Sequence, residues 1–218
     1  MRSFVIREGR FTPAQRKNLQ RFWSHYGVEP EDDPLSRFET LQPLVVEVGF
    51  GMGDSLFESA LREPNLNFLG IEVHRPGVGH LLGLASAGGV RGNLRVAIGD
   101  ATDVLQRLPA GSVSRVQVFF PDPWPKKRHH KRRLIQPEFV AEVAERLAPG
   151  GVLHVVTDWE PYAETIGLVL AGFPELSSVE PPDRVTTKYE RRGVALGHVI
   201  TDFAVRRGRT QPPATVGR

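Results

Sequence analysis

The sequence of 218 residues contains no cysteine. It therefore offers no thiol nucleophile, no disulfide and no thiolate metal ligand, and nucleobase chemistry through a covalent cysteine adduct is excluded. It also has no apolar run of membrane-spanning length, and its N-terminus has no signal-peptide core. These absences predict a soluble, cytoplasmic protein without a membrane association.

Charge of one sign is only in slight excess, because the formal net charge is +3. The isoelectric point is nevertheless near 9.5, and the positive charge is concentrated locally, so a basic patch is expected. Hydrophobic residues make up 40% of the chain, which is enough for one sizeable core. We expect one domain with an N-terminal arm.

Much of the local charge follows one apolar run, Val116-Gln117-Val118-Phe119-Phe120, which is typical of a buried strand. The run stops at a proline-rich loop with one carboxylate, Asp122, and one large aromatic, Trp124, which we call the aspartate loop (residues 121–125). Six of the next eight residues, the basic segment (residues 126–133), are Lys or Arg. A carboxylate and a ring beside such cations indicate a site that holds a nucleic-acid backbone and presents one base.

Residues 1–39 are predicted to form an N-terminal arm with a basic start and an acidic linker at residues 29–34. Thr12-Pro13 is a helix opening for residues 14–26, which Gly27 closes. One side of this helix is basic and the other apolar. Contact with RNA and simple packing onto the main domain both remain open.

Residues 40–206 alternate strands with helices. The predicted strands are residues 44–49, 67–73, 94–98, 116–120 and 152–157. One predicted helix begins after Asp54 and runs through Ala60, and three others cover residues 78–87, 137–147 and 162–171. This repetition predicts a doubly wound parallel sheet. Residues 176–179 and 195–205 are expected to close it as an antiparallel pair without a helix between them. Residues 181–193 are then an exposed loop, and residues 207–218 are predicted to be a disordered tail.

Three glycines at alternate positions, Gly49, Gly51 and Gly53, follow the first predicted strand and allow a close backbone approach to a ligand. We call residues 49–53 the glycine loop. Glu47 precedes it, where an acid would repel the pyrophosphate of a dinucleotide. An acid there suits a cationic ligand such as the ammonium and sulfonium groups of S-adenosylmethionine.

Two further acids follow the next strands. Glu72 ends the second strand, where this kind of fold accepts hydrogen bonds from ribose hydroxyls. Asp100 follows the third strand and is placed to accept from an adenine amine. With Glu47, these acids predict a nucleoside-containing, positively charged cofactor at one edge of the sheet.

Five blocks of sequence carry a resemblance to a known family: residues 47–53, 70–79, 119–133, 157–160 and 187–193. They resemble the successive blocks of bacterial tRNA (guanine-N7-)-methyltransferase, the TrmB family, over roughly residues 44–206. The resemblance implies a class I S-adenosylmethionine-dependent methyltransferase fold, a Rossmann-like α/β domain with a mostly parallel seven-stranded sheet and an antiparallel C-terminal strand. It also implies methyl transfer to N7 of the variable-loop guanine, position 46, of tRNA by a monomer or homodimer.

Residue roles carry over by position. The implied cofactor contacts are Glu47, Gly49, Gly51, Gly53, Glu72, Asp100 and Asp122, and Asp122 is also the implied catalytic residue. The implied substrate contacts are Lys126, Asp158, Thr187, Lys188, Tyr189 and Glu190, and the implied RNA contacts are Arg128, His129, His130, Lys131, Arg132 and Arg133. Tyr189 stands where the family has phenylalanine, a change that should keep stacking. No metal is expected, because adjacent histidines without a carboxylate cluster are rarely ligands.

Guanine N7 carries a lone pair and no proton, so the reaction needs positioning and no general base at that atom. Our hypothesis is that Asp122, assisted by Asp158 or Glu190, accepts hydrogen bonds from the guanine edge as positive charge develops on the ring. Trp124 or Tyr189 could stack on an unpaired base. For Trp124 a role as a loop anchor is equally open, and Trp159 is expected to plug a strand end.

Two other functions compete with this interpretation. A methyltransferase for an exocyclic amine of adenine or cytosine also has a polar residue, proline and an aromatic at the fourth strand end. Such enzymes commonly have two adjacent prolines there, whereas Asp122 separates Pro121 from Pro123 in this sequence. A non-catalytic RNA-binding module would have no use for the acids at positions 47, 72 and 100. An NAD-dependent dehydrogenase is disfavoured by Glu47 and by the glycine spacing.

Overall fold

The computed structural model describes residues 11–90 and 92–208, in which strands and helices alternate. The strands are β1 (Gly27–Val28), β2 (Leu44–Val48), β3 (Asn67–Glu72), β4 (Leu94–Ile98), β5 (Val113–Phe119), β6 (Leu147–Thr157), β7 (Leu176–Ser178) and β8 (Thr201–Arg207). The α-helices are α1 (Pro13–Tyr26), α2 (Asp54–Arg62), α3 (Arg75–Ala87), α4 (Ala101–Leu105), α5 (Pro137–Arg146), α6 (Glu160–Ala171) and α7 (Lys188–Ala195), and two 3₁₀ helices are η1 (Pro34–Arg37) and η2 (Lys127–Arg132).

The strands form one sheet in the order β1-β4-β3-β2-β5-β6-β8-β7. The pairs from β1 to β6 are parallel, whereas β8 is antiparallel to both β6 and β7. The predicted α/β class is confirmed, with eight strands in place of seven because Gly27 and Val28 pair with Val96 and Ala97 of β4. The winding reverses between β2 and β5, which is where open α/β sheets place their ligand site.

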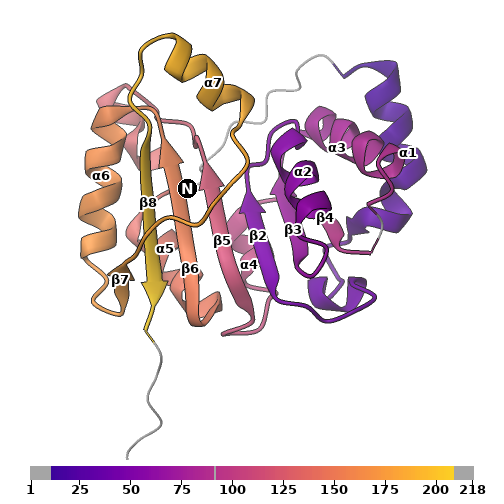
Figure 1. Ribbon diagram of the computed structural model, residues 1–218, viewed down its shortest axis with the longest axis horizontal. Helices are drawn as coiled ribbons and strands as arrows, with labels where there is room; N and C mark the ends of the chain where they lie inside the picture. Colours follow the sequence, from indigo (N-terminus) through magenta and orange to yellow (C-terminus); the bar gives the residue numbers. More distant parts are fainter. Residues whose placement is uncertain (1–10, 91, 209–218) are drawn as a thin grey trace, which may run out of the picture.

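Helices cover the two faces of the sheet in two groups (Figure 1). On one face, α1, α2 and α3 contribute Leu19, Leu56 and Leu81 to a buried cluster with β2, β3 and β4. On the other face, α4, α5 and α6 bury a second cluster against the sheet. This division follows from the apolar faces of the helices, each of which must be buried against the sheet.

The first helix is held closely against the third. Thr12 and Gln15 form a capping box that starts α1. A Cβ at Gly79 of α3 would lie 2.2 Å from the Gln15 carbonyl oxygen, and one at Gly83 would lie 2.3 Å from the Asn18 side chain. Small residues on α3 therefore let α1 approach. The predicted basic start and most of the predicted tail, residues 1–10 and 209–218, lie outside the described residues.

The prediction of an exposed loop over residues 181–193, with no helix before the last strand, was wrong. Helix α7 occupies Lys188–Ala195, and Ala195 ends it instead of starting a strand. The Thr187 side chain accepts from the Glu190 backbone N–H and the Glu190 carboxylate accepts from the Thr187 backbone N–H, a capping box that fixes the first turn. The segment before α7 crosses the face of the sheet over β8 and β6 (Figure 1).

Candidate active site

A cavity of about 1930 Å³ lies at the carboxyl ends of the central strands. Its wall includes the glycine loop, the ends of β2 and β3, the aspartate loop and the segment that leads into α7. The structure thus brings the two loops that the sequence singled out to one continuous space. No group of three or more His, Asp or Glu residues in the described ranges could hold a metal ion.

The glycine loop is shaped for a ligand. Gly49, Gly51 and Gly53 have φ angles of 73°, 60° and 79°, in the left-handed region that favours glycine. A Cβ at Gly49 would have no atom within 4 Å, and one at Gly51 would have only the Tyr189 ring at 3.9 Å. Gly53 differs, because a Cβ there would lie 2.8 Å from the Leu81 side chain. The first two glycines therefore leave their exposed side free, and the third lets α2 pack on α3.

Glu47 is buried, with 3% of its surface exposed, and it contributes to the wall of the cavity. Its Oε2 accepts a hydrogen bond of 2.6 Å from Nε2 of Gln117 on the neighbouring strand. Burial raises the pKa of Glu47 to about 7; the Gln117 hydrogen bond and the charge of Arg115 oppose the rise, and Glu72 adds to it. A cation beside this carboxylate would stabilise its charged form.

Glu72 ties the glycine loop to the end of β3. Its Oε2 accepts from the Gly51 backbone N–H at 2.8 Å, and its Oε1 accepts from the N–H groups of Val73 at 2.7 Å and His74 at 2.9 Å. The carboxylate also contributes to the cavity wall, so it is available to a ligand hydroxyl through its remaining lone pairs. Its role towards a ribose stays a prediction.

Asp100 lies at the N-cap of α4, where its Oδ1 accepts from the Thr102 backbone N–H at 3.0 Å. Its neighbours Gly99 and Ala101 contribute to the cavity wall, but Asp100 itself does not. The structure therefore places this acid beside the cavity as a helix cap, and its predicted contact with an adenine amine stays a prediction.

The aspartate loop is held in a conformation that ordinary residues seldom adopt. Phe120 and Trp124 have φ angles of 53° and 44°, each costing about 1–3 kcal/mol. Two hydrogen bonds fix the loop: the N–H of Phe120, just before it, donates to the Val156 carbonyl at 2.8 Å, and Arg133 Nε donates to the Pro123 carbonyl within it at 2.9 Å. Asp122, between these anchors, is exposed to the cavity.

Trp124 is half-buried and contributes to the same wall. The Arg132 guanidinium lies 5.2 Å from the centre of its ring, and the His129 ring meets it edge-on at 5.8 Å. Its Nε1 is buried and has no hydrogen-bond partner in the part of the chain that the structure describes. These contacts explain why the ring is fixed, and they leave its possible stacking on a base untested. Trp159, expected as a strand-end plug, is 36% exposed.

The basic segment separates into exposed cations and one buried arginine. Lys126, Lys127, Arg128 and Lys131 are exposed, and His129, His130 and Arg132 are half-buried around η2. Partial burial and the nearby cations Arg132, Arg128 and Lys126 lower the pKa of His129, so it is less often charged than an ordinary histidine.

Arg133 is only 3% exposed. Besides the bond to the Pro123 carbonyl, its Nη1 donates to Thr165 Oγ1 at 2.8 Å, and its guanidinium lies 4.7 Å from the centre of the Tyr162 ring. It therefore anchors the aspartate loop to α6. We accordingly leave Arg133 out of the RNA surface that the sequence suggested.

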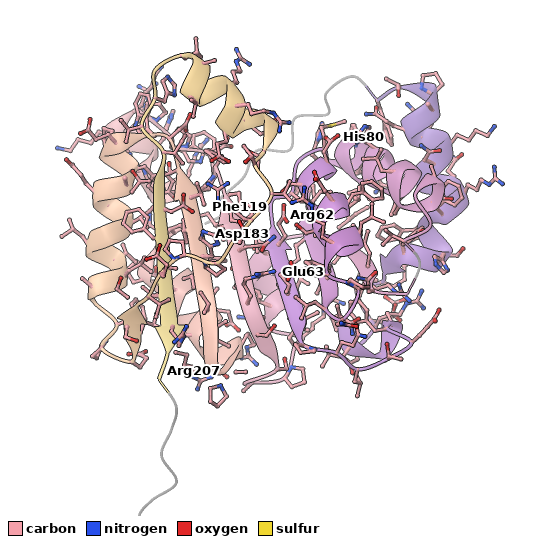
Figure 2. All side chains as sticks on the ribbon, viewed as in Figure 1. Arg62, Glu63, His80, Phe119, Asp183 and Arg207 are labelled. Carbon is pink, nitrogen blue, oxygen red and sulfur yellow. The ribbon has the colours of Figure 1, made fainter. Side chains whose placement is uncertain are left out.

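Two of the predicted substrate carboxylates already have partners. Glu190 receives two hydrogen bonds from Arg184, at 2.5 and 2.9 Å, and Arg184 also pairs with Asp202 of β8 at 3.0 Å. The Arg184 guanidinium lies 5.5 Å from the centre of the Phe119 ring, which Figure 2 shows near the middle of the sheet. Asp158 Oδ2 pairs with His198 Nδ1 at 2.9 Å. Glu190 thus fastens α7 to the sheet.

Of the other predicted substrate residues, two line the cavity. Thr187 and Tyr189 contribute to its wall, and Tyr189 is 63% exposed above the glycine loop. Lys188 is the first residue of α7. Sequence reasoning missed Gln117 and Arg184. A polar residue inside the apolar run of β5 was a signal for Gln117, whereas nothing in the sequence distinguished Arg184 from other charged loop residues.

Comparisons with known proteins identify relatives over most of the chain. A family model, Methyltransf_4, described as "Putative methyltransferase", matches residues 41–203. A "tRNA (guanine-N(7)-)-methyltransferase" of Nitrosococcus oceani is 50% identical over 213 residues, which are 94% of this chain and 90% of the relative. A protein of the same name from Saccharophagus degradans is 47% identical over 215 residues, 93% of each chain.

Solved structures share the architecture at much lower identity. TrmN from Thermus thermophilus superposes with a TM-score of 0.55 at 19% identity and covers 76% of this chain and 45% of its own. The 16S rRNA methyltransferase KamB gives a TM-score of 0.57 at 17% identity over 95% of this chain and all, 100%, of its own. These similarities show the fold alone.

Proposed function

This chain belongs to the family of the tRNA (guanine-N(7)-)-methyltransferases, and we propose that its cavity brings S-adenosylmethionine and the variable-loop guanine of tRNA, position 46, together. The chain is an S-adenosylmethionine-dependent methyltransferase. The observation that carries the proposal is the single cavity shared by the glycine loop and the aspartate loop. A cytoplasmic location, where tRNA is available, is part of the same proposal.

The residues around the glycine loop fit the cofactor. The open side of Gly49 and Gly51 gives a ligand access to the backbone, and Glu47 supplies a negative charge that suits an ammonium group. Glu72 has oxygens at the wall for hydroxyl groups. When bound, S-adenosylmethionine supplies an electrophilic methyl group on a sulfonium centre. Asp100 stands next to this region and is proposed to contact the adenine part.

The aspartate loop is proposed to hold the guanine. N7 needs no general base, so the main task of the protein is to align the base. Methylation places positive charge on the ring and makes N1–H and the amino group stronger donors. Asp122, the proposed catalytic residue, accepts from that edge and stabilises the developing charge. Glu190 is held by Arg184 and Asp158 pairs with His198, so either carboxylate would have to leave its partner to assist. Tyr189 lines the same cavity, and Lys126 directly follows the aspartate loop.

The exposed cations are proposed to bind the tRNA backbone. Lys127, Arg128 and Lys131 extend from η2 next to the aspartate loop, with Arg132 beside them. Phosphate contacts of this kind position the RNA without reading its sequence. Specificity for one guanine must then come from the base-binding end of the cavity and from the shape of the variable loop.

The test uses purified protein, radiolabelled S-adenosylmethionine and two unmodified tRNA transcripts. One transcript has guanine at position 46, and its matched control has adenine there. We expect label in the first transcript alone. Label in both would place the target elsewhere in the tRNA, and no label in either, despite tight RNA binding, would make the chain an RNA-binding module without this activity.

A further inference from the structure

Gln117 has no role in the proposed function, yet it is buried in the middle of the sheet and donates a hydrogen bond to Glu47, which lines the cavity. It is 4% exposed, on β5, and in the sheet register it is the direct neighbour of Glu47 on β2. Both side chains therefore point to the same face. The 2.6 Å hydrogen bond from Gln117 Nε2 to Glu47 Oε2 is the closest polar contact of that carboxylate among the described residues.

We propose that Gln117 is a positioning residue for cofactor binding: it orients Glu47 and keeps this carboxylate charged, and so sets the pH range in which the chain binds the amino-acid end of S-adenosylmethionine. The proposal rests on the proposed function only in taking S-adenosylmethionine as the ligand. An amide N–H that donates to a carboxylate favours its charged form. Without that donor, a buried acid is protonated more readily and loses its attraction for a cation.

Among the groups around Glu47, Gln117 is the main one that lowers the pKa of its carboxyl group. Burial disfavours the charged carboxylate, and Glu72 at the end of β3 opposes it further. Arg115, two residues before Gln117 on the same strand, favours it, but Arg115 is itself paired with Glu63 at 3.3 Å. Other charged or titratable residues contribute to the cavity wall from the surrounding loops and helices: Arg16, Glu29, Asp54, Glu58, His74, Arg75, Asp122 and Arg191. Gln117 is the donor that contacts the Glu47 carboxylate directly.

The first measurement needs only the unaltered protein. Calorimetric titration with S-adenosylhomocysteine, which has the same amino-acid end, is run at pH 7 and pH 8.5 in two buffers of different ionisation enthalpy. Because the pKa of Glu47 is about 7, we expect about half a proton released for each ligand bound at pH 7 and almost none at pH 8.5. The same proton release at both pH values would overturn the proposal.

The second measurement removes the donor in Gln117→Leu. If the titration of Glu47 moves up by about one pH unit, the affinity for S-adenosylhomocysteine falls about tenfold at pH 6, about fivefold at pH 7 and less than about twofold at pH 8.5. Gln117→Asn, which keeps the amide but shortens its reach, is expected to act in the same direction if the leucine variant does not fold. An equal loss at every pH would show a merely structural role and overturn the proposal.

Two controls make the result specific. Ser114→Ala removes a different hydrogen bond between β5 and β2, from Ser114 Oγ to the Leu44 carbonyl at 2.6 Å, and is expected to leave the pH profile unchanged. Methylthioadenosine has the nucleoside but no amino-acid end, so its affinity should not change with Gln117→Leu. Equal weakening of both ligands would overturn the proposal. Failure of the unaltered protein to bind S-adenosylhomocysteine at any pH would instead refute the proposed function.

Discussion

A buried carboxylate that must be charged to bind its ligand should destabilise the empty protein. Glu47 has an ordinary pKa of 4.5, which burial raises to about 7 in the folded chain. Below pH 4.5 the group is protonated in both the folded and the unfolded states and has no effect on their balance. As the pH rises above 4.5, the unfolded chain loses this proton first, so the free energy of unfolding falls until the folded-state pKa is passed.

The expected size follows from the two pKa values. At about 1.4 kcal/mol for each pH unit, the rise makes the protein about 3 kcal/mol less stable above pH 7 than it would be with a neutral group at position 47. Glu47→Gln supplies that neutral group with nearly the same shape, and its amide oxygen can accept from Gln117. The variant should therefore be more stable than the unaltered protein at pH 8 and equally stable near pH 4.5, while its cofactor affinity is lost.

The assay is urea unfolding of both proteins at pH 5 and pH 8 without ligand. We expect a stability difference of about 3 kcal/mol at pH 8 and only about 0.8 kcal/mol at pH 5. Glu164→Gln, at an exposed position on α6, is the matched control and should change little at either pH. Equal differences for Glu47→Gln at the two pH values would refute the argument, because the carboxylate would then titrate as an exposed acid does.

Three further predictions follow from the site. Asp122→Asn should lower the turnover number at least about 100-fold, a larger factor than any loss of affinity for S-adenosylhomocysteine; unchanged turnover with weaker tRNA binding would show a binding role only. Arg133→Ala should cost about 2 kcal/mol in urea unfolding, because it leaves the Pro123 carbonyl and Thr165 without a donor, whereas the exposed control Lys131→Ala should cost less than about 0.5 kcal/mol. Lys127→Ala should reduce the slope of log affinity for tRNA against log salt concentration by about one, and an unchanged slope would remove Lys127 from the phosphate contacts.

Most of the longer strands and helices could be predicted because local patterns and the fold agreed, whereas the short helix α4 (Ala101–Leu105) was missed. Residues 94–98 are a mostly apolar run with turn residues on both sides, as is typical of a strand, and β4 has those bounds. The Thr12-Pro13 signal located the start of α1. β1 could not be predicted, since a two-residue strand has no periodicity and exists only through its pairing with β4.

The helix α7 was missed although its signal was present. Thr187 and Glu190 have the spacing of a capping box, but the charged residues around them are typical of a solvated loop. What makes the helix stable is tertiary, because Arg184 joins Glu190 to Asp202 on a distant strand. A pattern confined to neighbouring residues does not contain that contact.

The candidate site shows the same division between local and spatial information. The glycine loop and the aspartate loop were recognised because their residue types are unusual where strands end. Gln117 and Arg133 were not distinguished, since their roles depend on which atoms meet in space: the register of β5 against β2 for Gln117, and the position of Pro123 for Arg133. Nothing in the sequence of the basic segment distinguishes the buried Arg133 from its more exposed neighbours.

The most direct test of the central claim is the chemical identity and position of the transferred methyl group. After reaction with the purified protein, a tRNA with guanine at position 46 is treated with borohydride and aniline, which cleave the chain at N7-methylguanine. We expect cleavage at position 46 alone, in proportion to the methyl groups incorporated. Methylated tRNA that resists cleavage would contradict the account, because the methyl group would then be on an exocyclic amine.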